Sequence, residues 1–351
     1  MPIVADEYTH VIGVDTHART HTYAIVETIT GRLATVAEFP TNPAGLARAI
    51  TWINRHAPGQ PLVAIEGTGS FGAGLAAVLE NQGVPVVEAR PPRAATRAGR
   101  GKTDAFDAEA AARAVISTDT AKLGWPRAGK IRSALRVLLT ARRAIDTRRT
   151  CDRNGLTALL RTIDLGLDAR KPLTDRQVSL IAAWRHHPTD DVEQAVAREE
   201  ATRLARNVIH ATIQLDANHR ALGRHVAELA PGLLAFRGIG PVTAAVFLTA
   251  YSHPGRVRSE AAFASLAGTA PLPASSGNTT RHRLNNRGDR RLNSALDVVA
   301  RVRMAHDADT RAYVERRRSE GRTPKEIKRT LKRYISRQVY RQLTATMASQ
   351  T

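Results

Sequence analysis

Short apolar runs separated by polar turns fill the first 90 residues of the chain. Each run is rich in Val, Ile or aromatic residues and is bounded by polar residues, a pattern typical of β-strands. The second and third runs are joined by a tight turn in which Gly31 can supply a positive φ. The predicted strands are residues 8–15, 21–28, 31–38, 61–65 and 84–88.

Two predicted helices alternate with the last of these strands. Asn42 can cap a helix over residues 43–56, with Pro43 at its first position. A glycine-rich stretch, residues 67–72, leads into a second helix that ends near Gln82. Three successive strands followed by alternating helix and strand indicate an α/β domain with a mixed sheet.

Apolar residues recur at helical spacing through most of the remaining chain. Long helices are predicted over about 130–163 and 191–229, and we expect them to pair as a coiled-coil-like arm. A shorter helix is predicted near 174–186, another starts near Arg290, and the tail is helical. The predicted domains are 1–125 (α/β), 126–230 (the helical arm) and 231–351 (a helical C-terminal domain).

The excess of positive charge narrows the range of functions that the chain can have. The 351 residues contain 52 Lys and Arg against 32 Asp and Glu, which gives a net charge of +20. Of these 52 residues 45 are Arg, the side chain that binds phosphates through two parallel hydrogen bonds. Such a basic protein is typical of nucleic-acid binding, and an anionic membrane surface is the weaker alternative.

Other classes of protein are disfavoured. The single cysteine, Cys151, excludes an internal disulfide and a Cys-based zinc site. No apolar run approaches the roughly 18 residues needed to cross a bilayer. The N-terminus lacks the pattern of a signal peptide. We therefore expect a cytoplasmic protein with access to DNA.

Two features of the C-terminal third are suited to contact phosphates. Residues 234–245 resemble a helix-hairpin-helix, in which Gly238 and Gly240 turn backbone N–H groups towards a phosphate, and the alternative is an ordinary junction between helices. Residues 311–341 hold 12 Lys and Arg, an excess of one sign that calls for an anionic partner. Between them a loop over 269–289 leads into an arginine cluster: Arg281, Arg283, Arg287, Arg290 and Arg291.

Carboxylates stand at three separated places. Asp15 follows the first strand and Glu66 follows the fourth, while Asp104 and Asp107 share one face of a helical first turn. Because strand ends of an α/β sheet share one edge, these four acids can converge there. Their mutual repulsion favours bound cations, and oxygen ligands suit Mg²⁺. Two Mg²⁺ ions would clamp the attacking and leaving oxygens of a phosphodiester.

Simpler explanations exist for the same residues. Asp15 could only open the turn after its strand, since Asp is common in turns. Asp104 and Asp107 could only favour the dipole of their helix. We interpret His10 and His17 as residues that flank the strand rather than as metal ligands.

The acidic motifs resemble the D, E, D, D motif of the RuvC-like domain in Piv/MooV and insertion-sequence one-hundred-ten transposases. They read G-V-D-T-H at 13–17, I-E-G-T-G at 65–69 and K-T-D-A-F-D-A at 102–108. The C-terminal transposase domain of that family is resembled by R-G-I-G-P-V-T-A at 237–244, G-T-A-P at 268–271 and S-S-G at 275–277. Here R-G-I-G replaces the usual P-G-I-G, and G-T-A-P replaces G-L-A-P or G-V-A-P. The resemblance covers most of the chain.

This resemblance implies an RNase H/RuvC-like fold and a DNA recombinase with a composite active site. The four acids would hold Mg²⁺, and a serine of the C-terminal domain would attack the DNA to form a covalent phosphoserine. The family's serine directly precedes a glycine, so it corresponds to Ser276, with Ser275 as the alternative. A serine hydroxyl is a weak nucleophile and needs activation, which the acidic metal site could supply.

The resemblance also implies the partners. A structured non-coding RNA, the bridge RNA, would select donor and target DNA. Two dimers of the chain would assemble into a homo-tetramer. The protein would be bacterial and associated with the nucleoid. Composition permits RNA binding, because the Arg-rich arm and the basic tail could follow phosphates. The 4% aromatic content argues against base stacking as the main mode of recognition.

Three other functions remain open on the sequence. A RuvC-like, Mg²⁺-dependent, structure-specific endonuclease would use the same acids with water as the nucleophile. A non-catalytic nucleic-acid-binding protein would use the acids only as helix caps and turn residues. An actin-like ATPase is suggested by V-I-G-V-D at 11–15, but the positive charge and the lack of further glycine-rich phosphate loops disfavour it.

Overall fold

The chain forms a sheet unit and a helical unit. The computed structural model describes residues 1–89, 103–273, 282–283 and 288–348. It divides into Met1–Ala128 and Gly129–Thr351, and each unit is described by itself below. Among the described residues, no helix is both long and apolar enough to cross a membrane.

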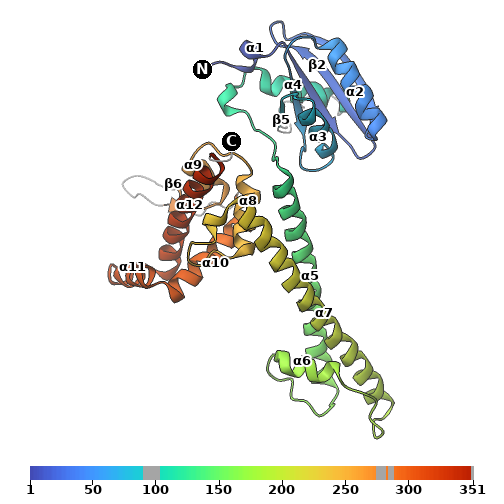
Figure 1. Ribbon diagram of the computed structural model, residues 1–351, viewed down its shortest axis with the longest axis vertical. Coiled ribbons are helices and arrows are strands. Elements are labelled where there is room, and N and C mark those ends of the chain that lie inside the picture. Colours follow the sequence, from blue (N-terminus) through green and yellow to red (C-terminus); the bar gives the residue numbers. More distant parts are fainter. Residues whose placement is uncertain (90–102, 274–281, 284–287, 349–351) are drawn as a thin grey trace. The chain divides into compact units, whose positions relative to one another are not determined.

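The first unit is built on a five-stranded mixed sheet with the order β3-β2-β1-β4-β5 (Figure 1). β1 pairs antiparallel with β2 and parallel with β4, so the chain reverses once and then crosses over through helices. All five predicted strands are present, and their ends differ from the prediction by no more than two residues. The strands are β1 (His10–Thr16), β2 (Thr20–Glu27), β3 (Leu33–Pro40), β4 (Pro61–Glu66) and β5 (Val86–Ala89).

Helices cover both faces of this sheet. α2 (Pro43–His56) and α3 (Ala73–Asn81) bury apolar residues against one face. α4 (Asp104–Ile116) and the short α1 (Val4–Glu7) pack on the other. The predicted cap is confirmed, because the side chain of Asn42 accepts a hydrogen bond from the amide of Gly45 at 2.8 Å. A 3₁₀ turn, η2 (Thr120–Lys122), follows α4.

The second unit begins with two long helices that lie side by side, as the sequence predicts (Figure 1). Asn218 of α7 donates to the carbonyl of Leu138 of α5 at 2.9 Å, and Arg142 of α5 donates to the carbonyl of Leu215 at 3.1 Å. Residues further along α5 contact residues earlier in α7, so the two helices run antiparallel. The helices are α5 (Lys130–Thr162), α6 (Asp175–Ala182) and α7 (Val192–Leu229).

Two cores stabilise this unit. One joins α5, α6 and the first half of α7. The other joins the first turns of α5 and the end of α7 to the C-terminal helices, with Leu135 and Val226 fully buried in it. A domain boundary near residue 230 therefore stays a prediction. The remaining elements are η3 (Pro231–Leu233), α8 (Pro241–Tyr251), α9 (Glu260–Leu266), β6 (Leu272–Pro273), β7 (His282–Arg283), α10 (Arg290–His306), α11 (Ala308–Ser319) and α12 (Pro324–Ala348).

Candidate functional site

One face of the sheet brings β1, β4 and α4 together. Gly13 of β1 lies directly against α4, since a Cβ there would stand 2.6 Å from the amide nitrogen of Ala112 and closer still to the carbonyl of Ala108. Asp15 lies two residues further along β1, so its side chain points to the same face. In β4, Leu62 and Ala64 belong to the core under α4. Glu66 continues that alternation and faces α4 as well.

The strand register places the two strand-end acids beside each other. β1 and β4 are parallel, and Val14 pairs with Ile65. Asp15 and Glu66 are the next residues of each strand and thus occupy neighbouring positions on one sheet edge. Thr16 fixes this edge, because its hydroxyl donates to the carbonyl oxygen of Glu66 at 2.8 Å. The convergence expected from the sequence is therefore present for these two positions.

The first turn of α4 faces the same edge. Thr103 caps the helix by accepting from the amide of Phe106 at 3.3 Å, so Asp104 and Asp107 are not needed as caps. Asp107 is buried, with 4% of its surface exposed, and lies one position before Ala108, which touches Gly13. A carboxylate at that depth is costly unless it has partners. Helix-dipole stabilisation alone does not explain that burial.

His17 joins the two halves of the site. Its Nε2 lies 3.2 Å from Oδ2 of Asp15 and 3.5 Å from Oδ1 of Asp104. The sequence pattern predicts a strand-flanking role for His17, but the structure places its imidazole near two of the acids. The signal was present in the sequence, because residues two apart at a strand end share one face.

Ligand atoms of Asp15, His17 and Asp104 lie within 4.8 Å of one another, close enough to hold one metal ion together. Within the described ranges this group does not extend to Glu66 or Asp107. Two carboxylates and one imidazole suit a divalent cation, and carboxylate oxygen is the preferred ligand of Mg²⁺. The side chains of His17 and Asp104 are about half exposed, at 50% and 54%, so a substrate can reach them.

The loop after β4 is held firmly. The amide of Gly67 donates to Oε1 of Glu88 at 3.2 Å, and the hydroxyl of Thr68 donates to the other oxygen of Glu88. Gly67 adopts a φ of +75°, where a side chain would be strained. Its carbonyl accepts from the amide of Gly72 at 3.1 Å. Glu88 was not selected from the sequence, and it anchors the chain that follows Glu66.

Thr16→Val is expected to loosen the edge between Asp15 and Glu66. Valine keeps the shape of threonine but leaves the carbonyl of Glu66 without this donor, so the free energy of unfolding should fall by about 1 kcal/mol. Urea unfolding measures this change. Thr51→Val is the matched control, because the Thr51 hydroxyl donates to a helical carbonyl, that of Ala47, on an exposed surface. Equal losses in both variants would contradict a special role for Thr16.

The predicted helix-hairpin-helix has its second helix, but only a short 3₁₀ turn and irregular turns lie directly before the Gly238–Gly240 turn. After α7 and η3, residues 234–240 form turns, and α8 starts at Pro241. Gly238 has a φ of +82° and packs on Val299 of α10. The amide of Gly240 donates to the hydroxyl of Thr243 at 3.1 Å, so a phosphate at this turn would compete with that bond.

The serine loop and part of the arginine cluster lie outside the described residues. This applies to Ser275, Ser276, Arg281 and Arg287. The backbone of Arg283 belongs to the short strand β7.

α10 begins at Arg290, within the predicted arginine cluster. Arg290 and Arg291 are exposed in its first turn, behind an Asp289 cap. Cations at a helix N-terminus oppose the helix dipole.

Two family models match the chain. The model described as "Transposase", of the DEDD type in IS110 elements, matches residues 12–164, which include all four predicted acids. The model described as "Transposase IS116/IS110/IS902 family" matches residues 231–315, which include the Gly238–Gly240 turn and the serine pair. No curated protein matches the chain. A DEDD-type domain implies dependence on a divalent metal, in agreement with the cluster at Asp15 and Asp104. The chain thus matches, in order, the models of two domains of IS110-family insertion-sequence transposases, and these matches support an enzyme that acts on DNA.

Proposed function

We propose that this transposase cuts and rejoins DNA at a Mg²⁺-dependent acidic site with a serine nucleophile. The observation that carries the proposal is the meeting of Asp15 and Asp104, from opposite ends of the sheet unit's sequence, at one imidazole. Glu66 and Asp107 complete the acidic face next to them. Carboxylates gathered this closely repel one another, and a bound divalent cation would relieve that repulsion.

The acids would bind the cations and orient them towards the scissile phosphate. When bound, Mg²⁺, in our proposal as two ions, supplies positive charge that stabilises the phosphoryl oxygens. Ser276 supplies the nucleophile. A bond forms between its Oγ and phosphorus, the bond from phosphorus to the leaving oxygen breaks, and the serine proton ends on that oxygen. The product is a phosphoserine ester with one DNA strand.

Arginines of the C-terminal domain would steady the DNA. We assign this role to the cluster around the serine loop, Arg281, Arg283, Arg287, Arg290 and Arg291, and to the Gly238–Gly240 turn. Exposure of Arg290 and Arg291 at a helix N-terminus supports it. A water-using endonuclease would need only the acids, so the nucleophile separates the two functions.

We further propose that a structured non-coding bridge RNA selects the donor and target DNA, and that two dimers of the chain form a tetramer. In the tetramer the sheet unit of one copy would meet the serine of another. These proposals rest on the family likeness. Exposed arginines along α5, among them Arg136, Arg143 and Arg148, offer phosphate contacts without base readout.

Trapping of a covalent adduct tests the nucleophile. The full chain is incubated with the RNA encoded by its element, donor DNA and Mg²⁺, then denatured and analysed by gel and peptide mass. We expect a DNA adduct on the peptide that contains Ser276, and we expect Ser276→Ala to abolish it while Ser275→Ala retains it.

The other outcomes decide among the alternatives. An adduct that persists in Ser276→Ala and is lost in Ser275→Ala would move the nucleophile by one residue. DNA cleavage without an adduct would favour the structure-specific endonuclease. Absence of both in a complex that still binds the RNA and DNA would favour a binding protein.

A further inference from the structure

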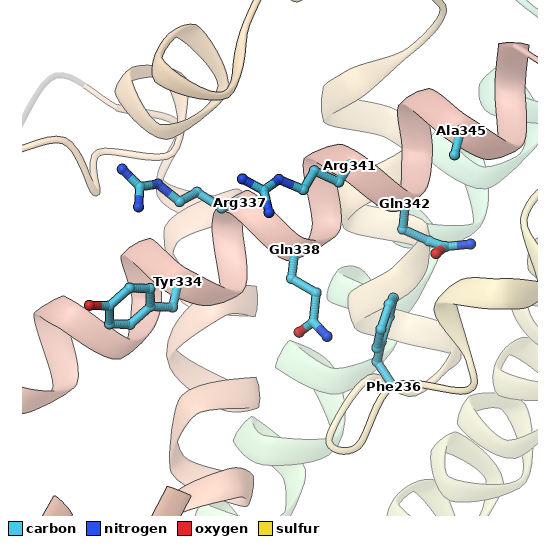
Figure 2. A pocket seen from close by; sticks show the side chains of 7 residues that line it. All are labelled: Phe236, Tyr334, Arg337, Gln338, Arg341, Gln342 and Ala345. Carbon is cyan, nitrogen blue, oxygen red and sulfur yellow. The ribbon is translucent and has the colours of Figure 1, made fainter. Parts of the chain in front are cut away.

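A groove of about 560 Å³ runs along α12 in the helical unit, outside the residues assigned to DNA cleavage (Figure 2). Its size lies in the range of sites that enclose small organic ligands, roughly 300–1,000 Å³. The lining combines two aromatic rings, two guanidinium groups and two amides. These residues, here called the α12 groove, are Phe236, Tyr334, Arg337, Gln338, Arg341 and Gln342.

The two rings are fixed before any ligand arrives. Tyr334 is 52% exposed, and Tyr313 of α11 packs against it edge-to-face, with centroids 6.3 Å apart. Phe236 sits in the turn before α8, and its partly buried ring packs against the core of the helical unit. A large exposed ring is a stacking surface for another planar group. Because both rings are held in place, little conformational entropy is lost on stacking.

The two amides present complementary hydrogen-bonding groups. Oε1 of Gln338 accepts from Arg303 at 2.9 Å, and an arginine can only donate, so this contact fixes the amide orientation. Nε2 of Gln338 is thus left as a donor. Gln342 donates through Nε2 to Thr346 at 3.2 Å, which leaves its Oε1 as an acceptor. Figure 2 shows both amides on the side of α12 that faces Phe236.

The guanidinium groups of Arg337 and Arg341 extend from α12 on the side away from Phe236 (Figure 2). Arg341 lies 2.5 Å and Arg337 lies 3.7 Å from a carboxylate oxygen of Glu260 in α9. One carboxylate faces two guanidinium groups, so the groove keeps a positive charge. Both arginines remain substantially exposed, at 73% and 45%. This arrangement suits a second anion such as a phosphate.

We propose that the α12 groove binds unpaired nucleotides of a nucleic-acid strand. Arg337 and Arg341 bind the phosphate, a base stacks on Phe236 or Tyr334, and the Gln338 donor and Gln342 acceptor meet the edge of that base. The proposal rests on the proposed function only in taking nucleic acid as the substrate. A nucleotide carries a phosphate and a planar base with hydrogen-bonding edges in one unit, which matches the arginines, the rings and the amide pair together.

A single strand fits better than a duplex. Bases in a duplex are stacked and paired, so their faces and Watson–Crick edges are not available. From Tyr334 to Gln342 the groove is about 12 Å long at 1.5 Å per helical residue, a length of a few nucleotides. Two rings make a local site, which agrees with the low aromatic content of the chain.

Photo-crosslinking to the full chain tests the location. The probes are fluorescent 12-mers of DNA with 5-iododeoxyuridine and of RNA with 5-iodouridine, without Mg²⁺, which separates this test from cleavage. We expect adducts on the peptides that contain Phe236 or Tyr334. Stronger labelling by one probe identifies whether the strand is DNA or RNA. Adducts confined to other peptides with both probes would overturn the proposal.

Affinity measurements on three variants test the chemistry. Phe236→Leu should weaken binding of the 12-mers about tenfold, because the stacking face is lost while the side chain stays apolar. Gln338→Glu should weaken it by a similar factor. It keeps the acceptor for Arg303, so the chain should stay folded while the groove gains a negative charge. Replacement of both Arg337 and Arg341 by Gln should lower the slope of log K against log salt by about 0.7, because the two arginines share one phosphate.

Arg318→Gln is the matched control, because Arg318 is an exposed arginine of α11 paired with Glu315 at 3.7 Å. It removes a positive charge from an exposed helix of the same unit and should leave the slope nearly unchanged. Unchanged affinity in Phe236→Leu and Gln338→Glu would overturn the proposal. Equal competition by a blunt duplex of the same sequence would also overturn it.

Discussion

Asp104→Asn is expected to reduce metal-dependent DNA cleavage at least about a thousandfold while the chain stays folded. The substitution keeps the size of the side chain and removes the charge that faces Asp15 and His17. The helix should persist because Thr103, not Asp104, caps it. Loss of a favourable dipole interaction costs at most about 1 kcal/mol, and relief of repulsion with Asp15 offsets part of it.

The measurement for Asp104→Asn has two arms. Cleavage of donor DNA follows activity, and titration with Mn²⁺ by electron paramagnetic resonance follows the metal site directly, where we expect at least tenfold weaker binding. Glu109→Gln is the control on the same helix. Glu109 pairs with Arg113 at a distance of 2.6 Å and does not belong to the Asp15–His17–Asp104 cluster. An Asp104→Asn protein that cleaves like the wild type would remove Asp104 from the site.

Much of the sheet unit could be predicted because its signals are local. Each buried strand is a short apolar run, and Asn42 with Pro43 marks a helix start that needs no tertiary information. The mixed character of the sheet also follows, since a parallel partner for β1 requires a crossover and α2 lies in the right place. The sequence pattern therefore indicates that the acids at the ends of β1 and β4 can share one sheet edge.

The contacts within the site could not be predicted in the same way. His17 looked like a polar residue beyond a strand, and only the packing of α4 on β1 brings Asp104 within reach of its imidazole. Glu88 was missed for a similar reason, because its bonds to Gly67 and Thr68 join positions about 20 residues apart. Burial of Asp107 depends on the same helix packing. Such contacts depend on distances between elements, which no single stretch of sequence encodes.

In the C-terminal domain, the helices could be predicted but the local shape of the glycine turn and the serine site could not. Its helices are largely as predicted, but residues 234–240 form turns where the helix-hairpin-helix motif suggested a helical approach. No helix forms over these residues because Pro231 and the glycines interrupt the helical pattern. The proposed nucleophile Ser276 lies outside the described residues, so its assignment depends on the family likeness alone.

Gly13→Ala is expected to destabilise the sheet unit by at least about 3 kcal/mol, the largest effect on stability that we predict. The added methyl group would meet backbone atoms of Ala108 and Ala112, which cannot rotate away as a side chain could. Relief of the clash requires α4 to move off the sheet. Because α4 carries Asp104 and Asp107, the same movement should weaken Mn²⁺ binding even though no acid is changed.

Urea unfolding of the full chain and hydrogen–deuterium exchange over residues 104–116 measure this prediction. Gly74→Ala in α3 is the control, because the nearest atom to an added Cβ is Leu46 Cδ1 at 4.0 Å. That change should be neutral or stabilise by up to about 1 kcal/mol through helix propensity. If Gly13→Ala unfolds at the wild-type urea concentration with unchanged exchange in α4, the close approach of helix and strand is wrong. The acidic site would then lose its physical basis, since that approach alone brings the acids of α4 to the end of β1.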